Sequence, residues 1–229
     1  MKLLSILEEF VKEIEKHNPY KLIIKGGTAL SLFYLNHHRE SEDLDFDADI
    51  KYLKEHAKIE SYFIDILENL KEKGIIRKFS KGKSGLAATN RYHMKIQLET
   101  HKIFCTKIDI DFVKLNGELR NKSELFLYSP ERLFITKMIT FTNRREFKDL
   151  YDISYLLSHI SFDTFKNNLE VVNLIDQVIN VILNEDLKKL FKQAFKNVDL
   201  GFKNLKEIQI DRFNVNLLKN LRVLKNKIR

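Results

Sequence analysis

The chain has 229 residues, of which 44% are hydrophobic and 31% charged, and its formal net charge is +8. This length supports one or two domains with a buried core, and this hydrophobic content excludes a disordered protein. No apolar run reaches the roughly 18 residues of a membrane span, acids such as Glu8 and Glu13 interrupt any apolar leader, and the single Cys105 excludes an internal disulfide. We therefore expect a cytoplasmic protein with no membrane association.

The N-terminal part of the sequence mixes the periodicities of helices and strands, which predicts an α/β fold with a small mixed sheet. The expected elements are, in chain order, a helix over 2–16, a strand over 22–25, a helix over 28–35, a strand over 43–48, a helix over 51–73, and strands over 75–79, 91–99 and 102–113. The segment from Lys81 to Gly85 contains a GKS tripeptide, but Arg77 stands where a phosphate-binding P-loop needs its first glycine. We predict a hairpin turn there.

After Pro130 the pattern becomes entirely helical. The expected helices cover 133–141, 147–157, 162–183, 185–197 and 212–228. We therefore place a domain boundary at Ser129-Pro130, with one domain over 1–129 and a helical C-terminal domain over 130–229.

The stretch from Lys25 to Asp49 carries the main chemical signal. Asp43, Asp45 and Asp47 alternate with apolar residues, so a strand places all three carboxylates on one face. A second alternation places Asp109 and Asp111 on one face of a later strand. Carboxylates at this spacing are ligands that suit Mg²⁺, with Mn²⁺ as an alternative metal.

A glycine pair precedes the first acidic strand and opens a short helix, an arrangement suited to anions. We expect Asp43, Asp45 and a third carboxylate, Asp109 or Asp111, to bind metal and to activate an attacking hydroxyl. The reaction would be attack on the α-phosphate of a nucleoside triphosphate (NTP). The expected phosphate contacts are Gly26, Gly27, Thr28, Arg39 and Ser41.

These residues also carry a family resemblance. The run GGTALSL followed by R-x-S-x-D-L-D-F resembles the opening motif of the nucleotidyltransferase superfamily, whose fold is shared with polymerase beta. More closely it resembles the AbiEii/AbiGii-type toxins of abortive-infection and toxin–antitoxin systems, over roughly the first 155 residues. The resemblance implies that residues 1–129 form the catalytic domain, that an NTP is the substrate, and that a cognate antitoxin is a partner.

The resemblance also implies roles for individual residues. Gly26, Gly27, Asp43 and Asp45 fall on the family's motif, and Asp109 matches its third carboxylate best, with Asp111 fitting the alternation equally. In the helical part the matching residues are Lys137, Arg144, Asp149 and Asp152. Lys137 and Arg144 are expected at the triphosphate, and Asp149 is expected to organise the site. From the sequence alone, Lys137 fits a solvated helix lysine as well.

The acceptor is expected to be RNA, with the 3′ end of tRNA as one candidate. The last 18 residues contain six basic side chains and no acid, a charge pattern that suits a polyanion. The candidate RNA-binding residues are Arg212, Lys219, Arg222, Lys225, Lys227 and Arg229. The alternatives are a small-molecule or protein-hydroxyl acceptor, or a non-catalytic RNA-binding protein with this fold.

Overall fold

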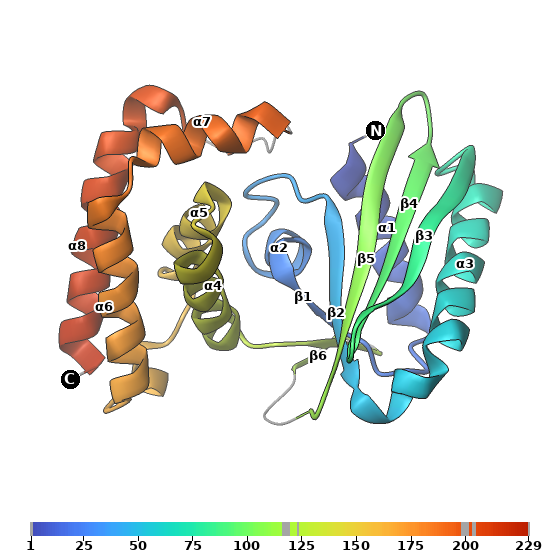
Figure 1. Cartoon of the computed structure of the whole chain (residues 1–229), viewed down its shortest axis with the longest axis horizontal. Coiled ribbons are helices and arrows are strands. Elements are labelled where there is room, and N and C mark those ends of the chain that lie inside the picture. The colour runs from blue at the N-terminus through green and yellow to red at the C-terminus, as the bar shows by residue number, and fades with distance from the viewer. Residues whose placement is uncertain (1, 116–119, 123, 198–201, 203–204, 229) are drawn as a thin grey trace. The chain divides into compact units, whose positions relative to one another are not determined.

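The computed structural model describes the chain except for residues 1, 116–119, 123, 198–201, 203, 204 and 229. It divides into two compact units, which Figure 1 shows by element. Unit 1 comprises Met1–Asn36 and Glu40–Ser129, and unit 2 comprises His37–Arg39 and Pro130–Arg229. A three-residue piece of an N-terminal loop therefore belongs to the helical unit.

Unit 1 confirms the predicted α/β class and combines a mixed sheet with helices. Its helical segments are α1 (Leu3–Lys16), α2 (Gly26–Ala29), the π-helical η1 (Leu30–Tyr34), the 3-10 helix η2 (Ile50–Glu55) and α3 (His56–Glu72). Its strands are β1 (Ile23–Lys25), β2 (Asp43–Asp49), β3 (Lys78–Ala88), β4 (Arg91–Glu99), β5 (Ile103–Val113), β6 (Arg120–Lys122) and β7 (Leu125–Leu127).

The described strands form one sheet in the order β3-β4-β5-β2-β1-β7-β6. β2 pairs with β5 in parallel, and β1 pairs with β7 in parallel, whereas the other neighbours are antiparallel. The two acidic strands, which are far apart in sequence, are thus direct neighbours in the middle of the sheet. This pairing positions the candidate site.

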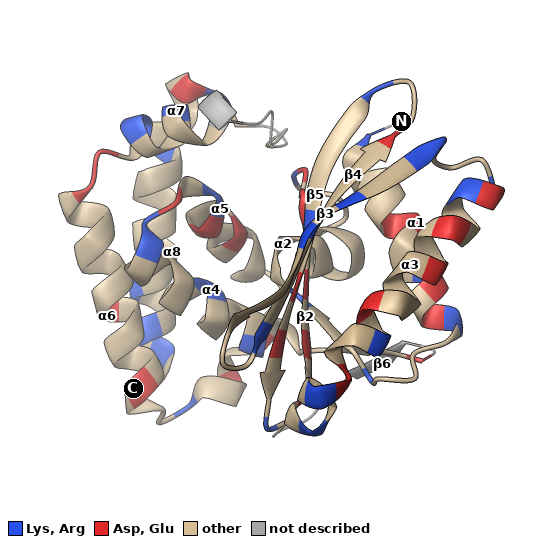
Figure 2. Ribbon diagram, turned by 45° about the vertical axis from the view of Figure 1, so that its right-hand side comes forward, with Lys and Arg blue, Asp and Glu red and all other residues tan. Residues whose placement is uncertain are grey.

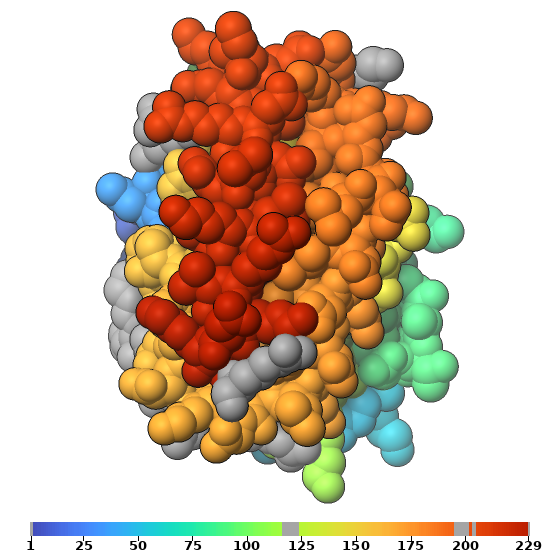
Figure 3. All heavy atoms as spheres, turned by 90° about the vertical axis from the view of Figure 1, so that its left-hand side faces the viewer, coloured from blue at the N-terminus to red at the C-terminus, as the bar shows by residue number. Residues whose placement is uncertain are grey.

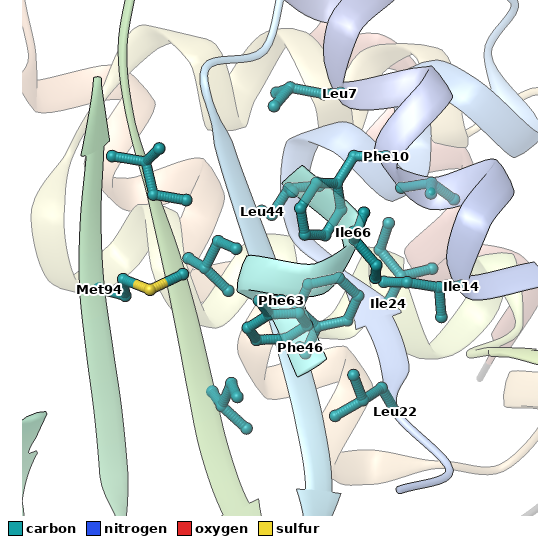
Figure 4. Packing of buried hydrophobic residues seen from close by; sticks show 14 of the residues in the cluster. Leu7, Phe10, Ile14, Leu22, Ile24, Leu44, Phe46, Phe63, Ile66 and Met94 are labelled. Atoms are coloured by element: carbon teal, nitrogen blue, oxygen red, sulfur yellow. The ribbon is translucent and has the colours of Figure 1, made fainter. Parts of the chain in front are cut away.

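One face of the sheet packs on α1 and α3. Leu44 and Phe46 of β2 are buried on this face, and Phe46 stacks on Phe63 of α3 with ring centroids 5.9 Å apart. Phe63 in turn contacts Phe10 of α1, at 5.7 Å between centroids. Figure 4 shows these aromatic rings packed among aliphatic side chains of the same cluster. Because the apolar half of β2 faces this core, its aspartates face the opposite side of the sheet.

Three local predictions for unit 1 differ from the structure. The predicted hairpin turn at Lys81–Gly85 is wrong, since these residues lie inside β3, which pairs with β4 through register shifts. Irregular pairing lets glycines remain within a strand. The predicted helix over 51–73 begins with the 3-10 helix η2, and β6 and β7 were not predicted, because strands of three residues are too short to show a periodicity.

Unit 2 consists of helical segments. They are α4 (Pro130–Arg144), α5 (Phe147–Leu156), the 3-10 helix η3 (Phe162–Phe165), α6 (Leu169–Asn184), α7 (Leu187–Asn197), the 3-10 helix η4 (Glu207–Gln209) and α8 (Ile210–Ile228). Phe147 of α5 is buried and contacts the rings of Phe191 and Phe213, so α5, α7 and α8 share an aromatic core. Figure 3 shows α8 lying along α6 with its outer side chains at the surface. Among the described helices, none is long and apolar enough to cross a membrane.

The aromatic contact between Phe63 and the sheet should dominate the stability of unit 1. Replacing Phe63 with alanine removes a fully buried ring and should lower the free energy of unfolding by about 3–5 kcal/mol. Urea unfolding followed by far-ultraviolet circular dichroism measures this change. Ile103→Ala, at a side chain that is 61% exposed, is the control and should change the midpoint little. Equal effects of the two substitutions would contradict the packing described here.

Candidate active site

The polar face of the sheet in unit 1 is defined by six side chains on β2 and β5. The parallel register places three pairs side by side: Asp43 with Lys107, Asp45 with Asp109, and Asp47 with Asp111. In two of these pairs both residues are aspartates, which repel each other unless nearby positive charge compensates them. Figure 2 shows the acidic (red) and basic (blue) positions on these strands.

Asp47 and Asp111 are compensated by a fixed network. Lys25 of β1 forms ion pairs with both carboxylates, at 2.6 Å for Asp111, and Arg91 of β4 binds Asp111 through two hydrogen bonds of 2.7 and 3.1 Å. The Tyr128 hydroxyl donates to Asp47 at 2.6 Å. Burial alone would raise the pKa of Asp111, but Lys25 and Arg91 outweigh it and lower that pKa. Burial alone would likewise lower the pKa of Lys25, and the two aspartates raise it.

Asp43 and Asp109 are compensated differently, by one lysine and one histidine. The Lys107 ammonium lies 3.5 Å from Asp43 and 3.1 Å from Asp109. The Nδ1 atom of His93 lies 2.6 Å from the other oxygen of Asp109. Burial would raise the pKa of Asp109, but the hydrogen bonds from His93 and Lys107 are stronger and lower it. Asp109 is therefore a stable carboxylate at neutral pH.

Gly26 is required where the backbone passes Asp45. Its φ is +74°, in the region that disfavours side chains, and a Cβ atom there would collide with the Oδ2 atom of Asp45. Thr28 lies two residues further on, and its hydroxyl donates to the backbone oxygen of Asp43 and lies 2.9 Å from the hydroxyl of Ser41. These contacts fix the start of β2 against α2. Of the predicted residues, unit 1 thus holds Gly26, Gly27, Thr28, Ser41, Asp43, Asp45, Asp109 and Asp111.

Unit 2 holds the other predicted residues around two buried carboxylates. Asp152 accepts hydrogen bonds of 2.7 Å from both Nε and Nη2 of Arg39, and the Lys137 ammonium lies 2.7 Å from it. Asp149 accepts two hydrogen bonds from Arg144, at 2.7 and 2.8 Å, and Lys137 bridges to it at 3.2 Å. Glu146 also pairs with Arg144 at 3.4 Å and with Lys148 at 2.9 Å, so four cations and three carboxylates leave this cluster with a formal charge of +1.

His38 completes the unit 2 cluster. Its ring is fully buried, stacks on Tyr151 and places Nε2 2.7 Å from Asp152. Burial lowers the pKa of His38 more than the nearby Asp152 raises it, so the ring is neutral at pH 7. Arg39 and Lys137 in turn help to hold the pKa of Asp152 well below its usual range, against the effect of burial.

Several side chains of these clusters were not predicted as site residues. Lys107 is the one with a local signal, because it stands two residues before Asp109 and so shares its strand face. His93 and Lys25 meet the acids through strand pairing, and His38 meets Asp152 from 114 positions away, so no local pattern reveals them. Among the predicted RNA-binding residues, Lys225 pairs with Asp176 and Lys227 lies over the ring of Phe162, whereas Arg229 lies outside the described residues.

The neutral state of His38 predicts a pH dependence of stability. The folded-state pKa lies below the ordinary 6.5, so the unfolded chain binds more protons below pH 6.5 and stability falls as the pH drops. The free energy of unfolding should fall by up to about 1.4 kcal/mol per pH unit as the pH drops below 6.5. His38→Gln, which replaces the ring nitrogen with an uncharged amide donor, should flatten this dependence in thermal unfolding scans. His159→Gln, at an exposed histidine of the same unit, should not, and an unchanged slope in His38→Gln would contradict the assignment.

Comparisons with known proteins identify a family and similar folds. The family described as nucleotidyl transferase AbiEii toxin, type IV toxin–antitoxin system, matches residues 10–216. A search of curated proteins found no match. The fold is similar to the crystal structure of JHP933 from Helicobacter pylori, with a TM-score of 0.67, 18% identity, and coverage of 99% of this chain and 91% of that one.

A second H. pylori structure, described as a candidate nucleotidyltransferase, has a TM-score of 0.65 and 19% identity over 98% of this chain and 93% of its own. At these identities the two structures support the fold alone. The family match, in contrast, covers most of the sequence and confirms the resemblance drawn from the glycine pair and the acidic strand. The chain belongs to the AbiEii family of nucleotidyl transferase toxins, and it is a nucleotidyltransferase.

Proposed function

We propose that this enzyme transfers a nucleoside monophosphate from an NTP to a hydroxyl group of RNA, with tRNA as the first candidate acceptor, in a Mg²⁺-dependent reaction. The observation that carries this proposal is the polar face of the sheet, where Asp43, Asp45 and Asp109 lie together on two paired strands. The acceptor oxygen forms a bond to the α-phosphorus, pyrophosphate leaves, and the hydroxyl proton is released. As a toxin, the enzyme would be paired with a cognate antitoxin.

The donor set fits a divalent metal by its chemistry. In the described part of the chain, no three His, Cys, Asp or Glu side chains are already grouped as a metal site. The Lys107 ammonium lies 3.5 Å from Asp43 and 3.1 Å from Asp109, and this cation beside both carboxylates supports a metal site there. Carboxylate oxygens are the ligands that Mg²⁺ and Mn²⁺ prefer. When bound, the metal would neutralise phosphate charge and lower the pKa of the attacking hydroxyl.

Asp109 is a better third ligand than Asp111. Both carboxylates have partners, His93 and Lys107 for Asp109 and Lys25 and Arg91 for Asp111. Asp109, however, lies directly beside Asp45 in the parallel register, whereas Asp111 lies beside Asp47. The lowered pKa of Asp109 favours a ligand over a general base, since an efficient base has a pKa near the working pH. We therefore propose Asp43, Asp45 and Asp109 as the metal ligands.

The remaining predicted residues divide into phosphate contacts and positioning groups. We propose Gly26 and Gly27 as backbone contacts of the phosphates. Thr28 and Ser41 are buried, and their hydroxyls are engaged with each other and with β2, which supports a positioning role for both.

In unit 2 the cluster carries a net positive charge, which supports phosphate binding. Arg144 is its more exposed cation, with 41% of the side chain accessible, and we propose it and Lys137 as the triphosphate contacts. Asp149 and Asp152 hold these cations in place, and Arg39, which is buried against Asp152, supports the same cluster.

Helix α8 supports an RNA acceptor. Arg212, Lys219 and Arg222 are exposed and form no ion pair with any described residue, so their charges remain available to phosphates. Binding through such contacts weakens as salt is added, because each contact releases counterions. Lys225 and Lys227 have partners within unit 2 and are weaker candidates.

A labelling assay tests the reaction and its carboxylates together. The purified protein is incubated with Mg²⁺, total bacterial RNA and each α-³²P-labelled NTP in turn. Label should appear in RNA for at least one NTP, and Asp43→Asn combined with Asp45→Asn should reduce it at least about a hundredfold, equal to some 3 kcal/mol of transition-state stabilisation. Asp65→Asn, at an exposed position of α3, is the control. Label on protein or on no macromolecule would contradict the RNA acceptor.

The position of Lys107 predicts an effect on metal affinity. Lys107→Ala removes a positive charge beside Asp43 and Asp109 and should tighten Mn²⁺ binding about fivefold or more, since a charge pair at 4 Å is worth about 1 kcal/mol even in water. Electron paramagnetic resonance of free Mn²⁺ measures this without turnover. Lys102→Ala, at an exposed position, should leave the affinity unchanged. Unchanged or weaker binding in Lys107→Ala would show that the two carboxylates do not bind the metal.

A further inference from the structure

The polar face continues beyond the carboxylates, across the outer strands β3 to β5. On β4, Tyr92, Met94 and Ile96 are buried in the core, so Lys95 and Gln97 point to the other side of the sheet. On β5, Cys105 shares that side with Lys107 and Asp109, because the three residues are separated by steps of two. The proposed metal ligands and these outer positions therefore lie on one face of one sheet.

This outer part, which we name the outer strip, consists of Ser80, Gly82, Lys95, Gln97 and Cys105. All five are exposed. The antiparallel register places Gln97 beside both Cys105 and Ser80, so the strip crosses three strands without interruption. None of its residues is acidic, which distinguishes it from the carboxylates on the neighbouring part of the face.

One residue of the strip, Lys95, forms an unfavourable charge pair with Lys107, which lies outside the strip. Lys95 lies directly opposite Lys107 in the pairing of β4 with β5. Like charges at such positions destabilise a sheet. Lys107 is held by Asp43 and Asp109, but Lys95 forms no ion pair with any described residue. An anion bound beside Lys95 would remove this cost.

The edge strand adds further positive charge and a shallow surface. β3 carries Lys78, Lys81 and Lys83 and no acidic residue. Lys81 pairs with Glu60, and Lys78 lies opposite Glu99, so Lys83 and Lys95 contribute most of the uncompensated charge. Gly82 lies against Lys95, and a Cβ atom there would be 3.3 Å from the Cβ of the lysine. Because Gly82 has no side chain, the surface beside Lys95 is flat enough for an extended polymer to lie across it.

We propose that the outer strip binds the sugar-phosphate backbone of the acceptor RNA and leads its reactive hydroxyl toward Asp109. This inference rests on the proposed function, since it assumes an RNA acceptor. Lys95 supplies positive charge, and Gln97 and Ser80 supply hydrogen-bond donors to phosphate and ribose oxygens. The exposed sheet surface has room for an extended segment of RNA. These contacts involve no base. The strip therefore contributes affinity and orients the RNA, and it does not contribute sequence specificity.

The single cysteine provides a direct probe of the strip. Cys105 lies beside Gln97, and its alkylation by a small maleimide is measured by mass spectrometry with and without unfractionated bacterial tRNA. Bound tRNA should slow alkylation at least about fivefold. Lys95→Gln should weaken tRNA binding and reduce the slope of log affinity against log salt by about one, whereas Lys58→Gln on α3, which covers the other face, should change neither.

The outcomes separate this inference from the proposed function. Protection of Cys105 by tRNA that is lost in Lys95→Gln supports the strip. Labelled RNA without protection of Cys105 would overturn the strip and leave the RNA acceptor standing. Protection by NTP and Mg²⁺ alone, with no further effect of tRNA, would assign the surface to the nucleotide and overturn the inference. An unchanged salt slope in Lys95→Gln would also overturn it.

Discussion

The parallel register of β2 and β5 is the constraint on which unit 1 depends. It brings Asp45 beside Asp109 and Asp47 beside Asp111, two repulsive pairs on one face of a sheet. The sheet keeps this register because a shift of one residue would expose Phe46 and Ile110 and bury the acids. The core on α1 and α3 therefore holds the carboxylates together against their repulsion. Lys25, Arg91, His93 and Lys107 then supply the compensating charge and hydrogen bonds.

Unit 2 also contains neighbouring carboxylates whose negative charge must be compensated. Asp149 and Asp152 are completely buried on α5, where an uncompensated carboxylate is very unfavourable. Arg39 reaches them from the His37–Arg39 loop, and Lys137 and Arg144 reach them from α4, so the two acids tie α4, α5 and this loop into one unit. A cluster with more cations than acids is both a structural link and a source of positive potential. The phosphate role proposed for Arg144 uses that excess.

The sequence predicted those features that depend on local periodicity. The alternation of Asp43, Asp45 and Asp47 placed them on one strand face, and the glycine pair marked the entry to α2, because both patterns are contained in a few residues. The choice between Asp109 and Asp111 had no local answer, since both lie on the same face of β5 and differ in what neighbouring strands bring to them. The burial of His38 depends on Asp152, more than a hundred residues away. The lysine- and glycine-rich start of β3 resembled a turn because irregular pairing, which tolerates such residues, leaves no periodic pattern.

The charged side chains of the polar face differ in how tightly they are bound and how exposed they are. This difference suits the catalytic role proposed for this face of the sheet. Asp47 and Lys25 are 10% and 19% exposed and are locked in a network with Asp111, Arg91 and Tyr128. Four residues back along the strands, Asp43 and Lys107 are 35% and 40% exposed and lie 3.5 Å apart. The inner network fixes the backbone of both strands, so that the outer carboxylates keep their positions when a ligand replaces their cation. The core on α1 and α3 and this inner network therefore act together to keep Asp45 beside Asp109 despite their mutual repulsion.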